Sequence, residues 1–375
     1  MNLQPAAGRS TAKQTVLISS GPRPSAKRWG RFSRPDQLHR RAQVRRIIKE
    51  SDDATSIVLV PDSKVSETVR AGQFLTLIAQ IDGRAVKRAY SLSELPKSGT
   101  LTVTSKRVEG GVMSAYLNTR LREGDWIQFA GPSGDFVLPA QTPAHYVFAA
   151  AGSGITPIMA MLEQLLEQEH SRTPITVIYG NRREQDILFR ERLDAWSGRY
   201  KSLSVRYLLS KPAKDWSGGR GRISADVLRD AAPGTGALYF LCGPDDFNSS
   251  LREELVALGV PKQAIASEQF TTLARESRPH PKDPHPVMFR VGGSEREVTV
   301  RPGETLLEAG LKAGVALPFS CTMGGCGHCK IKVLDGDVAT DAPNCLTEPE
   351  RQAGYALACC AYPHRQATVT VEEKH

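Results

Sequence analysis

Six of the seven cysteines lie in one stretch near the end of the chain. Four of them have the spacing Cys-x4-Cys-x2-Cys followed, after 29 residues, by another cysteine; they are Cys321, Cys326, Cys329 and Cys359. Four thiolates at this spacing are typical of a plant-type [2Fe–2S] cluster. Three glycines between the first and third cysteine lack a Cβ, so the loop can wrap tightly around such a cluster.

Two alternatives stay open at this site. Zinc can also be bound by four cysteines, although zinc ribbons usually pair two Cys-x2-Cys knuckles, and the cysteines here divide three and one. Either of two adjacent cysteines could close the site. The segment Leu357–Pro363 resembles the closing motif of ferredoxins, whose ligand is the first cysteine. That resemblance implies Cys359 as the ligand and leaves Cys360 and Cys345 as packed or free thiols.

A second candidate site begins at the end of an expected strand, with Arg88, Ala89, Tyr90 and Ser91. Strand alternation puts Arg88 and Tyr90 on one face, where a planar ring could stack on the phenol while the guanidinium pairs with phosphate. About twenty residues later come Gly110, Gly111, Val112, Met113 and Ser114. Two glycines before a helix can offer free N–H groups to a pyrophosphate. A simple β turn and a helix cap are the alternative interpretation.

A third candidate site is a glycine-rich turn that follows the expected strand 145–151 and opens a helix, with Gly152, Gly154, Thr156 and Pro157. The glycines allow a tight turn and the close approach of a pyrophosphate, and proline suits the first turn of a helix. The next strand ends at Asn181, Arg182 and Arg183. No ribose-binding acid stands there, and the two arginines favour the 2′-phosphate of NADPH. A glycine-rich turn without a ligand is the alternative.

These motifs resemble those of the ferredoxin-NADP reductase family, in which the first group binds flavin and the glycine-rich turn binds NAD(P)H. The resemblance implies that Tyr90 stacks on the isoalloxazine ring, that Ser91 lies near its N5 atom, and that Arg88 binds phosphate. Gly111, Met113 and Ser114 would continue the phosphate contact, and this intact second motif favours FAD over FMN.

The resemblance extends to two later segments. Cys242, Gly243 and Pro244 follow a strand and match a family segment in which the thiol lies near the nicotinamide. Phe270 ends a segment, Glu268–Phe270, that is similar to the family's closing segment. There it would cover the flavin face that the nicotinamide must reach, unless it is a core phenylalanine.

The surrounding pattern predicts four parts after the first 38 residues. Residues 39–140 hold short β-rich stretches separated by Gly and Pro turns, typical of an antiparallel β-barrel, here the FAD-binding domain. Residues 141–275 alternate strand and helix, which predicts a doubly wound parallel-sheet α/β domain for NAD(P). Four prolines between 276 and 286 indicate a semi-rigid linker, and 287–375 form an α+β ferredoxin domain of the β-grasp type.

Net charge separates the first residues from the rest. The chain carries +9, of which residues 1–50 supply +10, from twelve Lys and Arg against two acids, so the remainder sums to −1. We expect a basic, disordered tail at 1–38, either a simple solvated extension or a contact for an anionic surface. A neutral body argues against nucleic-acid binding. The absence of a long apolar segment and of a signal peptide predicts a cytoplasmic protein without a transmembrane segment.

The domain order resembles that of reductase components of multicomponent oxygenases, similar to types that serve phenylacetyl-CoA epoxygenases and fatty-acyl desaturases. We therefore expect electrons to pass from NAD(P)H through FAD to the [2Fe–2S] cluster and on to an oxygenase, hydroxylase or desaturase partner. Two alternatives assume a different final electron acceptor or a different class of protein. One is a stand-alone NAD(P)H reductase acting on quinones or a hybrid-cluster protein; the other is a redox-sensing binding protein.

Overall fold

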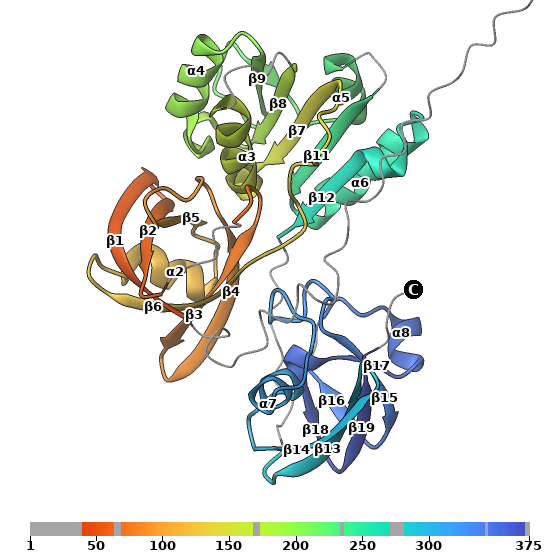
Figure 1. The fold of residues 1–375 in the computed structure, drawn as a ribbon. Helices are drawn as coiled ribbons and strands as arrows, with labels where there is room; N and C mark the ends of the chain where they lie inside the picture. Colours follow the sequence, from red (N-terminus) through yellow and green to blue (C-terminus); the bar gives the residue numbers. More distant parts are fainter. Residues whose placement is uncertain are drawn as a thin grey trace, which may run out of the picture.

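A computed structural model describes residues 40–63, 69–167, 173–232, 236–270, 281–341 and 344–371. The predicted basic tail and residues 276–280 of the predicted linker lie outside these ranges. Figure 1 shows three modules in chain order, each built around its own sheet. None of the helices in the described ranges combines the length and the apolar character needed to span a bilayer.

The first module is a six-stranded antiparallel sheet with the order β4-β3-β6-β1-β2-β5. A bridge between Leu92 and Val103 joins its two ends, so the sheet closes into the predicted barrel. Apolar residues alternate inward, as Leu75 and Leu77 do, and a single helix packs on this core. Its elements are β1 (Arg40–Ser51), β2 (Ala54–Pro61), β3 (Phe74–Ile81), β4 (Arg84–Ser91), β5 (Leu101–Lys106), α2 (Val112–Thr119) and β6 (Trp126–Ser133).

The second module is a six-stranded parallel sheet with the order β10-β9-β8-β7-β11-β12. Its central strands are continuous apolar runs, as expected for a sheet covered on both faces. The strands are β7 (His145–Ala151), β8 (Ile175–Asn181), β9 (Leu203–Leu209), β10 (Gly219–Arg220), β11 (Ala237–Gly243) and β12 (Ile265–Gln269). The helices are η3 (Gly152–Gly154), α3 (Ile155–Glu167), η4 (Glu184–Asp186), α4 (Arg190–Arg199), α5 (Ala225–Ala231), α6 (Asp245–Ala257) and η5 (Lys262–Ala264).

The third module has a five-stranded mixed sheet, β14-β13-β19-β15-β17, and a two-stranded sheet, β16-β18. Helix α7 (Leu306–Lys312) packs on it after a capping box formed by Thr305 and Glu308. The strands are β13 (His285–Val291), β14 (Ser294–Val300), β15 (Lys330–Asp335), β16 (Val338–Thr340), β17 (Tyr355–Leu357), β18 (Ala361–Pro363) and β19 (Ala367–Thr370). The remaining helices are α8 (Glu348–Gln352) and η6 (Ala358–Cys360).

The three modules differ in how they share apolar core. Ala54, Ala71 and Phe136 of the barrel module belong to the same buried cluster as the α3 face of the parallel sheet. The Phe136 ring lies edge-on to that of Phe240, with 5.7 Å between centroids. The core of the third module, in contrast, contains only residues from 287 onward. The first two modules are therefore joined by an apolar interface, and the third has a core of its own.

Strand β13 starts two residues earlier than the sequence pattern suggested, inside the predicted linker. His285 and Pro286 already pair with β14, whereas pairing with β19 starts at Val287. The missing N–H of Pro286 therefore leaves no bond to β19 unmade, which is why a proline is tolerated at this strand start.

Candidate functional site

The four predicted cluster ligands come together from two segments. Cys321, Cys326 and Cys329 lie in the loop between α7 and β15, and Cys359 lies in η6. Their thiols group two and two. The hydrogen bond with Cys326 raises the pKa of Cys321 and lowers that of Cys326, and the hydrogen bond with Cys359 raises the pKa of Cys329. Two thiol pairs suit the two iron ions of a [2Fe–2S] cluster.

Backbone and hydroxyl donors surround the same thiols. The amides of Met323 and Gly324 point at Cys321 Sγ (3.4 Å) and Cys359 Sγ (3.2 Å). The hydroxyls of Ser320 and Thr322 are buried and have no hydrogen-bond partner within the described residues. Such donors are what the sulfur atoms of an iron–sulfur cluster require. Among the described residues, no three His, Cys, Asp or Glu side chains are grouped closely enough to hold a single metal ion.

The neighbouring cysteines take other positions. Cys360 is fully buried, and its carbonyl accepts a hydrogen bond from the amide of Asp341. Cys345 is exposed and lies beside the cysteine loop, where its amide donates to the carbonyl of Gly324. The sulfur of Cys359 accepts a hydrogen bond from the amide of Gly324 in the cysteine loop, at 3.2 Å. These positions agree with Cys359 as the predicted fourth ligand.

The predicted flavin segment occupies the end of β4, and its side chains alternate between the two faces of the strand. Arg88 and Tyr90 stand opposite Leu77 and Leu75, on the face that covers the barrel core. Burial raises the pKa of Tyr90 to about 12, so this phenol stays neutral. Ser91, on the other face, is buried and donates to Glu268 Oε2 at 3.1 Å. Ala89 is exposed.

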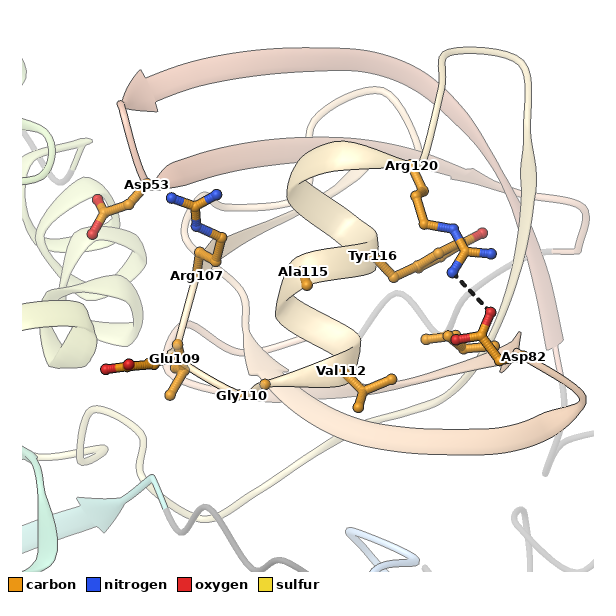
Figure 2. A pocket seen from close by; sticks show the side chains of 12 residues that line it. Asp53, Asp82, Arg107, Glu109, Gly110, Val112, Ala115, Tyr116 and Arg120 are labelled. Atoms are coloured by element: carbon orange, nitrogen blue, oxygen red, sulfur yellow. Dashed lines mark hydrogen bonds and ion pairs between the residues drawn. The ribbon is translucent and has the colours of Figure 1, made fainter.

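The second predicted flavin motif forms one wall of an open cavity of about 690 Å³ on the barrel module (Figure 2). Gly110 has φ +69°, and a Cβ on Gly111 would lie 2.5 Å from Ser114 Oγ, so both positions need glycine. Gly111 is the N-cap of α2, and no side chain caps this helix start. The first amides of a helix have no partner inside it, so those of Val112, Met113 and Ser114 can serve an anion.

The side chains of this motif differ in whether they can reach a phosphate in the cavity. The Ser114 hydroxyl accepts from the amide of Val108 and donates to the carbonyl of Gly111, each at 3.1 Å. Only its amide is therefore left for a phosphate. Met113 is buried in the barrel core, whereas the Val112 side chain is half exposed beside the cavity.

Among the cavity residues that were not predicted, Arg107 and Tyr116 are suited to a nucleotide. Figure 2 shows Arg107 next to Asp53 on the segment that leads into α2, and Tyr116 on the helix itself, near an ion pair between Arg120 and Asp82 (3.2 Å). A cation and a flat ring beside a helix start can hold a phosphate and a base. The sequence signal was present, since Arg107 closely precedes the glycine pair and Tyr116 follows it by one helical turn.

The predicted nicotinamide turn lies at the carboxyl ends of the parallel strands. Gly152 and Gly154 form η3, and Thr156 and Pro157 belong to the first turn of α3. A Cβ on Gly154 would lie 2.0 Å from the carbonyl oxygen of Cys242, so the turn can approach β11 only without a side chain. In parallel sheets of this kind, nucleotides bind at the carboxyl ends of the strands, where the order of the strands reverses.

The neighbouring strand ends supply further groups. Both polar side-chain atoms of Asn181 are buried, close to the hydroxyl of Tyr179. Arg182 and Arg183 follow it and are exposed, and the amide of Lys211 donates to the carbonyl of Arg182. A buried amide side chain and two exposed cations at this edge fit a nucleotide with an added phosphate. Lys211 was not among the predicted residues.

The structure brings the remaining predicted residues together around one carboxyl group. Cys242 pairs with Glu268 across β11 and β12, and Glu268 reaches Ser91 of the barrel. Burial raises the pKa of Glu268 to about 8 and raises that of the Cys242 thiol. Asn248 holds this corner by donating to the carbonyls of Gly243 and Glu268 at 3.2 and 2.9 Å.

The last two predicted residues frame this corner. Pro244 is the N-cap of α6, directly after β11, and Phe270 is half buried against the core of the parallel sheet. Glu268 itself was seen only as part of the closing segment, because its position opposite Ser91 depends on the packing of two modules. These features define a protein with separate flavin, nicotinamide and iron–sulfur modules in one chain.

Three protein-family profiles match the chain in the same order. They are the oxidoreductase FAD-binding domain (residues 42–138), the oxidoreductase NAD-binding domain (148–253) and the 2Fe-2S iron-sulfur cluster binding domain (289–364). The chain is 33% identical over 334 residues to a subunit of the 1,2-phenylacetyl-CoA epoxidase of Escherichia coli K12, covering 85% of this chain and 94% of that protein. It therefore belongs to the family of flavin- and [2Fe–2S]-containing oxygenase reductases.

Further relatives and solved structures agree. A stachydrine N-demethylase reductase subunit of Rhizobium meliloti is 31% identical, covering 80% of this chain and 87% of that one. Phthalate dioxygenase reductase has a similar fold, with a TM-score of 0.61, 21% identity, and coverage of 90% and 100%. The predicted fold class and the FAD, NAD(P) and [2Fe–2S] cofactors are thus confirmed.

Proposed function

We propose that this protein is the reductase component of a multicomponent oxygenase, hydroxylase or desaturase, which it supplies with electrons from NAD(P)H. Relatives that cover most of its length are named as reductase subunits of an N-demethylase and of a glycine betaine monooxygenase. One observation supports electron transfer from the flavin segment to the cluster loop within the chain. The Cys321 carbonyl accepts a hydrogen bond from Thr76 (2.8 Å), which stands opposite Ala89 of the flavin segment.

When bound, FAD accepts the two electrons of a hydride and releases them singly to the cluster, which carries one at a time. The chain's own residues then have distinct roles. Tyr90 and Arg88 hold the ring and phosphate on one face of β4. The amides of Val112, Met113 and Ser114 hold the pyrophosphate. Ser91 and Glu268 keep a proton between Oγ and Oε2 where the nicotinamide and flavin modules meet.

The nicotinamide nucleotide lies, in this proposal, on the Gly152–Pro157 turn, with Cys242 and Phe270 beside the nicotinamide. NADPH is preferred over NADH because the exposed cations of Arg182 and Arg183 can pair with its 2′-phosphate. Replacing both by Gln should raise the Michaelis constant for NADPH by roughly tenfold or more while leaving that for NADH within about twofold. Equal effects on both nucleotides would contradict the proposed phosphate contact.

We propose the module limits that the sequence predicts, 39–140 for FAD, 141–275 for NAD(P) and 287–375 for the cluster. A reducing compartment, the cytoplasm, is the proposed location, because cysteines grouped as iron ligands must stay reduced. The three-and-one ligand set Cys321, Cys326, Cys329 and Cys359 is the proposed cluster site.

The test compares Cys359→Ser with the adjacent Cys360→Ser. With NADPH, the wild type and C360S should bind iron and reduce cytochrome c. C359S should lose iron and most cytochrome c reduction, yet still reduce ferricyanide, which takes electrons directly from flavin. Retained cytochrome c reduction in C359S would refute the route through the cluster. Turnover with quinones but with no oxygenase component would favour a stand-alone reductase, and a failure to oxidise NAD(P)H would favour a redox sensor.

A further inference from the structure

The third module touches the barrel through polar contacts, unlike the apolar interface that joins the first two modules. Thr76 Oγ1 donates to the Cys321 carbonyl at 2.8 Å, and Ser133 Oγ lies 3.5 Å from the Ser320 carbonyl. His328 Nε2 lies 2.9 Å from Asp135 Oδ2. All of these contacts are made by the loop that carries the predicted cluster ligands. The loop therefore faces the barrel.

One face of the β3–β4 pair collects contacts to both other modules. Directly opposite residues of an antiparallel pair share a face, so Thr76, Ala89 and Ser91 point the same way, as does Lys87. Lys87 Nζ lies 3.3 Å from Glu308 of α7, and Ser91 binds Glu268. Figure 1 shows β4 at the edge of the barrel nearest the other two modules. The opposite face holds Arg88 and Tyr90.

The Thr76 contact is the most enclosed of the set. The threonine side chain is 1% exposed and the Cys321 residue 4% exposed, so water does not compete for this hydrogen bond. The other contacts lie at or near the edge, where Asp135 and Lys87 are partly exposed. A buried hydrogen bond to the carbonyl of a ligand cysteine fixes the position of that ligand relative to the strand.

We propose that Thr76 is a positioning residue that holds the cluster loop against the flavin strands, and that this contact sets the rate of electron entry into the cluster. The proposal rests on the function proposed above and deepens it. Each entry moves one electron: the reduced flavin loses it, and one ferric ion of the cluster becomes ferrous. The two electrons from each NAD(P)H therefore leave in two such steps.

Thr76→Val removes the hydroxyl and keeps the side-chain shape. Loss of one buried hydrogen bond should lower the population of the docked loop, and with it the rate of cluster reduction, by roughly three- to tenfold. Flavin reduction by NADPH should not change, because the nicotinamide module is untouched. Thr176→Val is the matched control. It removes a buried hydroxyl from β8, where Thr176 binds His145 at 2.9 Å, far from the cluster loop.

The measurements use the full holoprotein. Stopped-flow absorbance separates flavin reduction from cluster reduction, and hydrogen–deuterium exchange of the loop peptide around 320–328 reports docking without any turnover. T76V should speed loop exchange and slow cluster reduction at unchanged iron content, and Thr76→Ser, which keeps a hydroxyl, should restore both. The T176V control should match the wild type in both measurements.

Unchanged loop exchange or unchanged cluster reduction in T76V would overturn the proposal, as would a loss of iron that explains the slower rate. If T76V does not fold, Lys87→Gln replaces it, since a partly exposed ion pair contributes little to folding. K87Q should slow cluster reduction by about twofold, and no slowing would count against the proposal. A wild type whose cluster is never reduced by NADPH would instead refute the proposed function.

Discussion

The carboxyl group of Glu268 offers a prediction that follows directly from its surroundings. It lies between Ser91 of the barrel and Cys242 of the parallel sheet, and burial raises its pKa from 4.5 to about 8. We therefore expect Glu268 to be protonated at neutral pH in the protein without bound nucleotide. Glu268→Gln keeps the acceptor for the Ser91 hydroxyl but cannot titrate, so it isolates the contribution of this proton.

The magnitude follows from linkage. Between the unfolded-state pKa of 4.5 and the folded-state pKa of about 8, the folded protein binds a proton at Glu268 that the unfolded chain has lost. The contribution of this proton to the free energy of unfolding is therefore fully present below about pH 4.5 and declines as pH rises towards 8. The upper bound of the decline is about 5 kcal/mol, since one pKa unit corresponds to about 1.4 kcal/mol. E268Q should escape this decline.

Infrared difference spectra between wild type and E268Q measure the proton directly. At about pH 6 the wild type should show the C=O stretch of a protonated carboxyl that the variant lacks, and the band should vanish as pH rises through about 8. Thermal unfolding should show the two proteins equally stable near pH 5 and E268Q more stable near pH 9. A band that already disappears near pH 4 to 5, the ordinary range of a glutamate, would refute the reasoning.

Two further predictions concern packing. Gly154→Ala places a Cβ against the carbonyl of Cys242, so the Michaelis constant for NADPH should rise by roughly tenfold or more. Gly198→Ala on α4, where a Cβ meets open space, should leave this constant unchanged. Equal Michaelis constants for both variants in steady-state assays would contradict the close approach of the turn to β11. Phe136→Ala leaves a cavity in the apolar interface beside Phe240 and should lower the free energy of unfolding, measured by chemical denaturation, by about 3–5 kcal/mol. Phe136→Leu should lower it by less than about 1.5 kcal/mol. A loss below about 1 kcal/mol in Phe136→Ala would show that the interface contributes little to stability.

The sequence carried the features that depend on local spacing. The cysteine pattern predicted the iron–sulfur domain because a cluster needs thiolates at set intervals along the chain. The turn at Gly152 to Pro157 was visible because strand, glycines and helix follow each other directly. The expected strand 145–151 coincides with β7 (His145–Ala151) for the same reason. Pro286 was wrongly expected to precede the strand, since a proline can start a strand at a position without a neighbour on one side.

Contacts between modules could not be predicted in the same way. Glu268 meets Ser91 across 177 positions in sequence, and Thr76 meets Cys321 across 245. Neither contact leaves a local pattern, because each depends on how two finished domains pack. Arg107 had a local signal, a cation just before a glycine pair, but an isolated arginine is too common to single out without the cavity.

An anaerobic titration of the holoprotein with NADPH tests the proposed route most directly. Absorbance follows the flavin, and electron paramagnetic resonance follows the cluster, whose reduced form alone has an unpaired electron. We predict that NADPH bleaches the flavin and that the signal of one reduced [2Fe–2S] cluster per chain then appears. Flavin that is fully reduced by NADPH while the cluster stays oxidised would contradict electron flow from the flavin to the four cysteines.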